Sequence, residues 1–262
     1  MLKYIISAIS IYFFLGAFLF LIQRKILFNV SGLPKKPSEY GLNNILELEI
    51  PTIDGVNLLA WYSKPKINKP TLLYLHGNSF DIGERSYRIQ RYIQQGWGIL
   101  LLAWRGYSGN KGYPSEVNLY KDGEAALSWL KDFTSTNLED IVLYGESLGS
   151  AVAVELATRY AFKSVVLEAP FTSISDIAQK RYKIFPVKLL ILDNFDNISK
   201  INKIFTPILI ISGKKDEVIP HSHSQKLFLK ANEPKKSVFI DEARHNNLYD
   251  FGIEKEVLKF NI

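Results

Sequence analysis

A series of short apolar runs recurs along the chain from Thr71 onward, and this series limits the possible fold more than any other feature. The runs do not alternate strictly between apolar and polar residues, which is typical of strands buried on both faces of a parallel sheet. They occupy residues 71–77 (TLLYLHG), 98–104 (GILLLAW), 140–145 (DIVLYG), 164–170 (SVVLEAP), 207–213 (PILIISG) and 237–241 (SVFID).

Helical patterns fill the intervals between these runs, at residues 83–95, 119–131, 150–159 and 221–230. Strand and helix in alternation predict an α/β fold with a mostly parallel sheet and helices on both faces. Before the first run, the stretch ILELEIPTIDGVNLLAWYS alternates on either side of Asp54-Gly55, which predicts an antiparallel hairpin. In such sheets the reactive groups gather at the carboxyl ends of the strands.

The N-terminus is predicted to be a separate segment. Residues 4–23 carry no charge and are mostly Ile, Leu, Phe and Ala, and roughly 20 such residues suffice to cross a bilayer. A cleaved signal peptide would have a shorter apolar core that ends in small residues, whereas here bulky residues lead into Arg24 and Lys25. We therefore expect an uncleaved transmembrane anchor at 1–23, a linker at 24–44 and a globular α/β domain at 45–262.

Composition excludes several classes of site. The 262 residues are 47% hydrophobic, which suits one large globular domain, and they include no cysteine, so disulfides, thiolate zinc sites and cysteine nucleophiles are all excluded. The net charge of +6 comes from scattered lysines rather than a basic block. We find no phosphate-binding glycine loop, metal cluster or basic groove, so the sequence predicts no cofactor, no metal and no nucleic-acid partner.

Ser147 lies in the stretch Gly145-Glu146-Ser147-Leu148-Gly149, between a predicted strand and a predicted helix. A serine raised on a sharp strand-to-helix turn is typical of a nucleophile, and the flanking glycines would avoid collisions with neighbouring elements. The motif alone is common by chance, but the strand before it and the helix after it are the context that supports the interpretation.

A serine hydroxyl needs a base, and the base needs a group that orients it. His245 follows the last predicted strand, where it would project over the carboxyl edge of the sheet, although a loop histidine is also an ordinary surface residue. We expect His221 and His223 to be exposed at a helix start and His76 to end a strand. Asp216 follows another strand end and is our orienting acid, with Glu217 and Asp241 as rivals.

The attack also creates negative charge on the substrate oxygen, which backbone N–H groups must stabilise. We expect these donors to be the N–H of Leu148, directly after the nucleophile, and the N–H of Asn78, in the loop after the first parallel strand.

The chain resembles the α/β-hydrolases, and more narrowly the small membrane-anchored serine hydrolases with a serine-aminopeptidase-like domain. The matching stretches cover most of the chain beyond Gln23: QRKILF, LYLHGNS, AWRGYSGNKGYPSE, YGESLGSAVAVELA, LEAPFTSISDIA, DNFDNISKI, SGKKDEVIP and ARHNNL. The resemblance implies Ser147, Asp216 and His245 as nucleophile, acid and base, in the chain order of that superfamily. Relatives of this kind remove fatty acyl groups from proteins or hydrolyse esters and lipids.

Residues 171–205 lie where hydrolases of this fold commonly carry a cap, and their length allows a small one. We expect a fairly open pocket, with apolar lining drawn from Ile184, Phe185, Val187, Leu189 and Leu190, unless these side chains pack in the core. Arg105 lies in a Gly- and Tyr-rich loop and is expected to donate hydrogen bonds to loop carbonyls rather than to substrate.

The sequence thus predicts a membrane-anchored serine hydrolase that cleaves an acyl ester or thioester, with a lipid ester or an acylated protein as substrate. The excess of positive charge after the apolar segment leans toward a catalytic domain on the cytoplasmic face. The same residues would serve a peptidase or amidase, and a membrane-tethered scaffold on a retired hydrolase fold is the alternative outside enzymes. The oligomeric state is left open.

Overall fold

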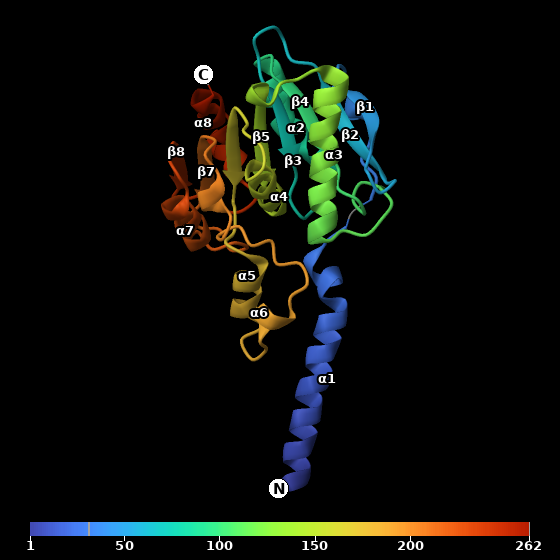
Figure 1. The fold of residues 1–262 in the computed structure, drawn as a ribbon, viewed down its shortest axis with the longest axis vertical. Coiled ribbons are helices and arrows are strands. Elements are labelled where there is room, and N and C mark those ends of the chain that lie inside the picture. The colour runs from blue at the N-terminus through green and yellow to red at the C-terminus, as the bar shows by residue number, and fades with distance from the viewer. Residues whose placement is uncertain (31, 262) are drawn as a thin grey trace.

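Figure 1 shows the computed structural model, which describes residues 1–30 and 32–261. Within these residues one sheet has the strand order β1-β2-β4-β3-β5-β6-β7-β8. The strands are β1 (Leu46–Pro51), β2 (Asn57–Ser63), β3 (Thr71–Leu75), β4 (Gly98–Leu102), β5 (Ile141–Glu146), β6 (Ser164–Glu168), β7 (Ile208–Gly213) and β8 (Lys235–Ile240). From β4 to β8 all neighbours are parallel, whereas β1 and β2 form the predicted antiparallel hairpin. The predicted α/β fold is confirmed.

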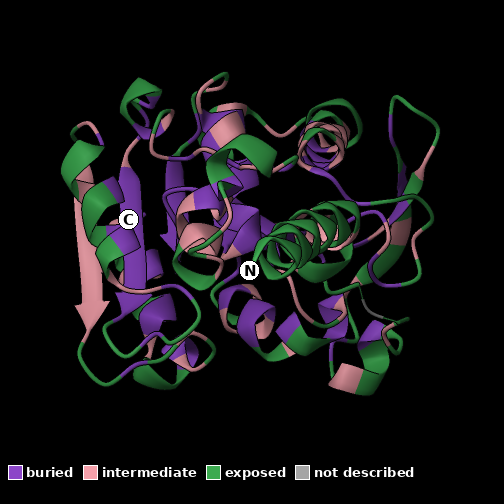
Figure 2. Cartoon of the chain, turned by 90° about the horizontal axis from the view of Figure 1, so that it is seen from below, coloured by how far each residue is buried: buried purple, intermediate pink, exposed green. Residues whose placement is uncertain are grey.

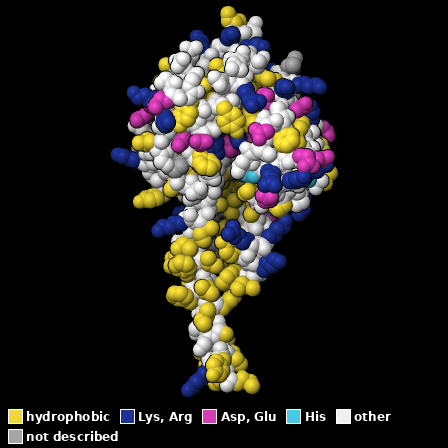
Figure 3. Space-filling model, turned by 180° about the vertical axis from the view of Figure 1, so that it is seen from behind, with side chains coloured by type: hydrophobic (Ala, Val, Ile, Leu, Met, Phe, Trp, Pro, Cys, Tyr) yellow, Lys and Arg dark blue, Asp and Glu magenta, His cyan; other side chains and the backbone are white. Residues whose placement is uncertain are grey.

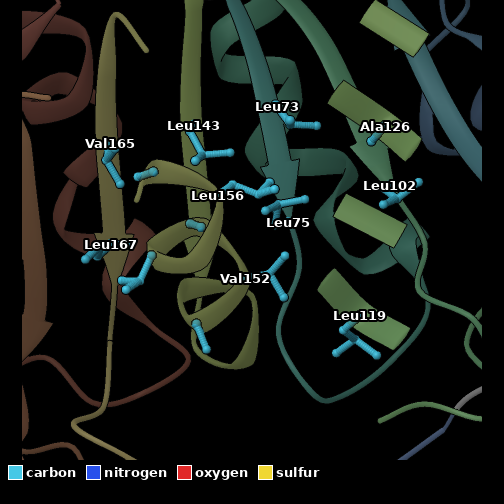
Figure 4. Packing of buried hydrophobic residues seen from close by; sticks show 14 of the residues in the cluster. Leu73, Leu75, Leu102, Leu119, Ala126, Leu143, Val152, Leu156, Val165 and Leu167 are labelled. Atoms are coloured by element: carbon cyan, nitrogen blue, oxygen red, sulfur yellow. The ribbon is translucent and has the colours of Figure 1, made fainter. Parts of the chain in front are cut away.

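Helices cover both faces of the sheet. One face carries α3 (Glu116–Thr134), α4 (Leu148–Ala157) and α7 (Ser222–Lys230), and the other carries α2 (Ser86–Gln94) and α8 (Ile253–Phe260). Figure 4 shows Val152 and Leu156 of α4 against Leu143 and Leu75 of the sheet. The central strands β3 to β7 are buried along their whole length because helices pack on both sides of them.

The element boundaries differ from the predictions in a few places. Helix α4 begins at Leu148, two positions before the predicted start, so Ser147 directly precedes its first residue. Strand β8 begins at Lys235 rather than Ser237, because Lys235 and Lys236 pair with Ile208 and Leu209 of β7. Helix α8 was not predicted, and its sequence IEKEVLKF mixes charged and apolar residues over only two turns.

Helix α1 (Leu2–Leu27) continues four residues beyond the predicted end of the anchor and extends away from the sheet (Figure 1). No residue within it is buried (Figure 2). An 18-residue window within it has a mean hydropathy of 2.5, and its 26 residues are sufficient for a membrane span. A short 3-10 helix, Pro37–Tyr40, lies in the segment that follows.

Residues 171–195 form a small lobe that lies beside the C-terminal half of α1 (Figure 1). The lobe contains helices α5 (Ile174–Arg181) and α6 (Val187–Leu190). It occupies the position predicted for a cap, between β6 and β7.

Candidate active site

Ser147 occupies the turn between β5 and α4 in a strained backbone conformation. Its φ of 50° and ψ of −111° lie in a region that residues other than glycine rarely adopt. The turn is fixed because the Ser147 N–H donates to the carbonyl of Glu168 in β6, at 2.8 Å. A turn of this kind lifts the hydroxyl above the carboxyl edge of the sheet.

The glycines on either side of Ser147 are required by close backbone approaches. A Cβ at Gly149 would lie 2.0 Å from the Leu75 carbonyl oxygen, and one at Gly145 would lie 2.5 Å from Cα of Ser150. Both contacts are far below van der Waals distance, so any side chain would push α4 away from the sheet. This explains the collisions that the sequence pattern predicts.

His245 lies between Ser147 and Asp216, each of which follows a different strand. Its Nε2 is 3.1 Å from Ser147 Oγ, and its Nδ1 is 2.7 Å from Asp216 Oδ2. Because a carboxylate can only accept, Nδ1 carries the proton and Nε2 is free to accept from the serine hydroxyl. The three side chains therefore form one hydrogen-bonded chain in the order needed for proton transfer from Ser147.

The structure pairs His245 with Asp216 rather than with either rival. Asp216 Oδ1 accepts from the N–H groups of Val218 and Ile219, both at 2.8 Å, which leaves Oδ2 for the imidazole. Glu217 instead approaches Arg244 at 3.8 Å, and Asp241 pairs with Lys214 at 2.6 Å. Both rival side chains are 74% exposed, whereas that of Asp216 is 1% exposed.

The expected oxyanion donors lie beside the serine, one at the start of α4 and one in the loop after β3. Leu148 is the first residue of α4, so its N–H has no partner within the helix. Gly77 brings the Asn78 loop close, since a Cβ there would lie 3.3 Å from Ser147 Cβ. Across the described residues, the N–H groups of Leu148 and Asn78 form no hydrogen bond to protein.

The Asn78 side chain is tied to the end of α1, a link that the sequence analysis missed. Its Nδ2 donates to the carbonyl of Leu27 at 2.5 Å, and its Oδ1 accepts from the Asn29 N–H at 3.1 Å and from the Tyr107 hydroxyl at 2.5 Å. The loop that would supply one oxyanion donor is therefore held by the residues that leave the N-terminal helix.

A cavity of about 540 Å³ opens above Ser147. Of the predicted lining residues, Phe185, Val187 and Leu190 line it, whereas Ile184 and Leu189 do not and are 71% and 85% exposed. The latter two do not pack in the core either, because they lie on the outer side of the short lobe. Further lining from α1 and α5 was not predicted from the sequence: Gly16, Leu19, Phe20, Gln23, Ile26, Leu27, Ile174, Ile177 and Ala178.

Comparisons with known proteins agree with this architecture. The esterase Pf2001 of Pyrococcus furiosus superposes with a TM-score of 0.73 over 89% of this chain and 97% of its own, at 20% identity. The sequence is 34% identical over 230 residues to an uncharacterized protein of Mycobacterium tuberculosis, covering 86% of this chain and 81% of the relative. It is 38% identical over 192 residues to human alpha/beta hydrolase domain-containing protein 17B, covering 73% of this chain and 65% of that protein. This chain belongs to the α/β-hydrolase superfamily. No family model matches it.

Beneath the Ser147 turn, this α/β-hydrolase carries a buried network of ion pairs. Arg85 Nη2 lies 2.9 Å from Glu146 Oε1, and Arg88 Nη1 lies 3.1 Å from Glu168 Oε1. Burial raises the pKa of Glu146, but the charges of Arg85 and Arg88 outweigh it and hold that pKa well below its usual range. Because Glu146 directly precedes Ser147 and the Glu168 carbonyl accepts from the Ser147 N–H, the network fixes the position of Ser147.

The three histidines other than His245 make structural contacts in this hydrolase. His76 is fully buried, with Nδ1 2.7 Å from the Gly77 carbonyl and Nε2 accepting from the Trp104 N–H at 3.3 Å. Burial, with a further contribution from Arg85, lowers the pKa of His76 to about 3. A neutral His76 thus supports the Asn78 loop from below.

The expected exposure of His221 and His223 is wrong. His223 is 3% exposed, and its Nδ1 lies 2.8 Å from Thr172 Oγ1 because the first turn of α7 packs under the loop after β6. His221 is half-buried, with Nδ1 2.9 Å from Ser212 Oγ. Burial lowers the pKa of both imidazoles.

The expected partners of Arg105 also need correction. Arg105 is buried and binds carboxylates rather than loop carbonyls: its Nε donates to Asp122 at 2.8 Å and its Nη1 to Asp54 at 3.0 Å. Asp54 belongs to the β1–β2 hairpin, so Arg105 connects the hairpin to α3 and has a structural role. Elsewhere, the described residues contain no group of three or more His, Asp or Glu that could hold a metal ion.

Proposed function

We propose that this protein is a membrane-anchored serine hydrolase that cleaves acyl esters or thioesters through an acyl-serine intermediate. The observation that carries the proposal is the chain from Ser147 Oγ through His245 to Asp216, with both hydrogen bonds at 3.1 Å or less. Ser147 and His245 line a cavity whose far end is apolar, which suits an acyl substrate.

In the first half-reaction, Ser147 Oγ attacks the carbonyl carbon of the substrate while His245 Nε2 takes the serine proton. Asp216 stabilises the imidazolium and keeps the ring oriented. The N–H groups of Asn78 and Leu148 stabilise the negative oxygen of the tetrahedral intermediate. His245 then gives its proton to the departing alcohol or thiol, and the acyl group stays on Ser147.

In the second half-reaction, His245 takes a proton from a water molecule as that water attacks the acyl-serine. Collapse of the second tetrahedral intermediate breaks the bond to Ser147, and the proton held by His245 returns to Oγ. The products are a carboxylic acid and the free enzyme. No step requires a cofactor.

Helix α1 supports the membrane part of the proposal. Its length and hydropathy suit a span, and Arg24 and Lys25 follow its uncharged stretch, residues 4–23, whereas Lys3 precedes that stretch. This imbalance favours a catalytic domain on the cytoplasmic face. Resistance of the full-length protein to alkaline extraction from membranes would support the anchor. Release into the soluble fraction would contradict it.

Turnover of short-chain esters, thioesters and amides by the full-length protein in detergent tests the catalytic part. We expect hydrolysis of esters and thioesters that Ser147→Ala abolishes and that Ser222→Ala, on the exposed start of α7, leaves unchanged. Amide hydrolysis as the fastest reaction would favour the peptidase alternative. A folded parent without serine-dependent turnover would overturn the proposal and favour a non-catalytic scaffold.

A further inference from the structure

The cavity above Ser147 is bounded on one side by helix α1, whose composition suits the membrane. Gly16, Leu19, Phe20 and Gln23 line it from α1, while Ile177 and Phe185 line it from the lobe. We propose that α1 is a wall of the acyl-binding site as well as an anchor, and that the acyl chain of a membrane-embedded substrate enters along it from the bilayer. This proposal rests on the proposed function of Ser147.

Polar side chains of α1 hold the helix against the lobe. Tyr12 donates to the carbonyl of Ile184 at 3.0 Å, and its ring stacks on Phe185 with the centroids 5.0 Å apart. The Gln23 side chain accepts from the Leu192 N–H at 2.8 Å. Polar groups in an apolar environment are costly unless they are paired, so these contacts give α1 a preferred face and a fixed position beside the lobe.

The wall formed by α1 packs closely against Phe185 at Gly16, the end far from Ser147. It is also long enough for a long acyl chain. A Cβ at Gly16 would lie 3.3 Å from Phe185 Cε1, so the absence of a side chain lets this ring approach the helix. From Gly16 to Leu27 the helix rises about 16 Å, at 1.5 Å per residue. The cavity therefore combines a reactive end at Ser147 with an apolar extension beside α1.

The apolar extension is open to the surroundings of α1 rather than to a polar surface. Phe20 and Leu190 line it from opposite sides, yet they are 38% and 37% exposed. Apolar side chains cover α1 in Figure 3, and Lys and Arg side chains lie around its junction with the lobe and the globular part. Such a patch is unfavourable in water but matches the acyl region of a bilayer with headgroups above it.

A photoreactive probe tests the inference on the unaltered full-length protein in lipid nanodiscs. The probe is a fluorophosphonate that carries a long alkyl chain with a diazirine near its end. After it has reacted with Ser147, illumination should cross-link the chain to the peptide that contains residues 12–24 of α1, as identified by mass spectrometry. Reaction at Ser147 with cross-links only to other elements would overturn the inference alone. Failure to react at Ser147 would overturn the proposed function and the inference with it.

A matched pair of tryptophan variants adds a kinetic test. Leu19 lines the cavity, whereas Leu21, two positions along the helix, does not line it and is 79% exposed. We expect Leu19→Trp to lower the ratio of kcat/KM for p-nitrophenyl palmitate to that for the butyrate by roughly tenfold or more, the effect of altered apolar contacts in a pocket. Leu21→Trp should keep the ratio of the parent. Equal ratios in both variants would contradict the inference.

Discussion

The carboxyl edge of the sheet and the α1–lobe region meet at Ser147, but they are built in different ways. At the sheet edge, the candidate catalytic residues are held by hydrogen bonds, such as those from the Val218 and Ile219 N–H groups to Asp216. In the α1–lobe region, α1 has no buried residue, and the wall of the cavity consists of partly exposed apolar side chains. Under the proposed function, the chemistry would depend on a rigid frame, whereas substrate selection would depend on a surface that only a membrane or a substrate completes.

The largest expected effect is the loss of kcat on substitution of Asp216. It measures how far activity at the sheet edge depends on one orienting carboxylate. We expect Asp216→Asn to lower kcat by about 10⁴-fold, because an amide no longer fixes the reactive tautomer of His245. The adjacent Glu217→Gln serves as the control and should keep kcat within about twofold, since Glu217 does not contact the imidazole. Steady-state kinetics on a soluble ester would measure both, and a larger loss in Glu217→Gln would show that the acid is misassigned.

The second effect concerns the stability contributed by the buried ion pairs beneath Ser147. Removing the buried charge of Arg88 leaves Glu168 unpaired, so we expect Arg88→Met to lower the free energy of unfolding by about 3–5 kcal/mol. Arg159→Met removes exposed ion pairs and should cost about 1 kcal/mol or less. Urea unfolding of the detergent-solubilised protein provides the measurement. Similar losses in both variants would contradict the rigid-frame description.

The third effect is the pH dependence that His76 gives to the free energy of unfolding. Its pKa of about 3 in the folded protein lies below the ordinary value of 6.5, so between these values the unfolded chain binds a proton that the folded protein does not. Stability contributed by neutral His76 is complete above pH 6.5 and is lost as the pH falls. We expect the parent to lose roughly 1.4 kcal/mol more per pH unit below 6 than His76→Gln. Parallel pH profiles for the two proteins would contradict this role.

The smallest expected effect is at Asn78, where the sheet edge and the α1–lobe region join. Asn78→Ala keeps the backbone N–H but removes the bonds to Leu27, Asn29 and Tyr107. We expect kcat for a short-chain ester to fall about tenfold with little change in KM, because a displaced donor stabilises the transition state less well. A rise in KM at constant kcat would instead indicate a binding role. Urea unfolding of the same variant separates this effect from a general loss of stability.

The sheet edge could be predicted from the sequence because its signals are local. The apolar runs predicted the strands of the sheet, and the glycines around Ser147 predicted a close approach that the Gly149 contact explains. The chemistry of the residues left Asp216, Glu217 and Asp241 open, and only the three-dimensional arrangement pairs His245 with Asp216.

The α1–lobe region could not be predicted, because its contacts join residues more than 160 positions apart, as in the hydrogen bond from Tyr12 to Ile184. The apolar run alone predicted a membrane anchor. It gave no indication that one face of the helix contacts the lobe. The polar residues within it, Tyr12 and Gln23, were the available signal for a face that packs against protein. The exposure of His223 was mispredicted for a related reason, since its burial depends on Thr172.

Labelling with a small fluorophosphonate, followed by mass spectrometric mapping of the modified residue, shows whether Ser147 is an activated nucleophile. We expect the full-length protein to be labelled at Ser147 and the labelling to disappear in both Ser147→Ala and His245→Ala, while His221→Ala is labelled as the parent is. Labelling at another residue, undiminished labelling of His245→Ala, or no labelling of the folded parent would contradict this expectation.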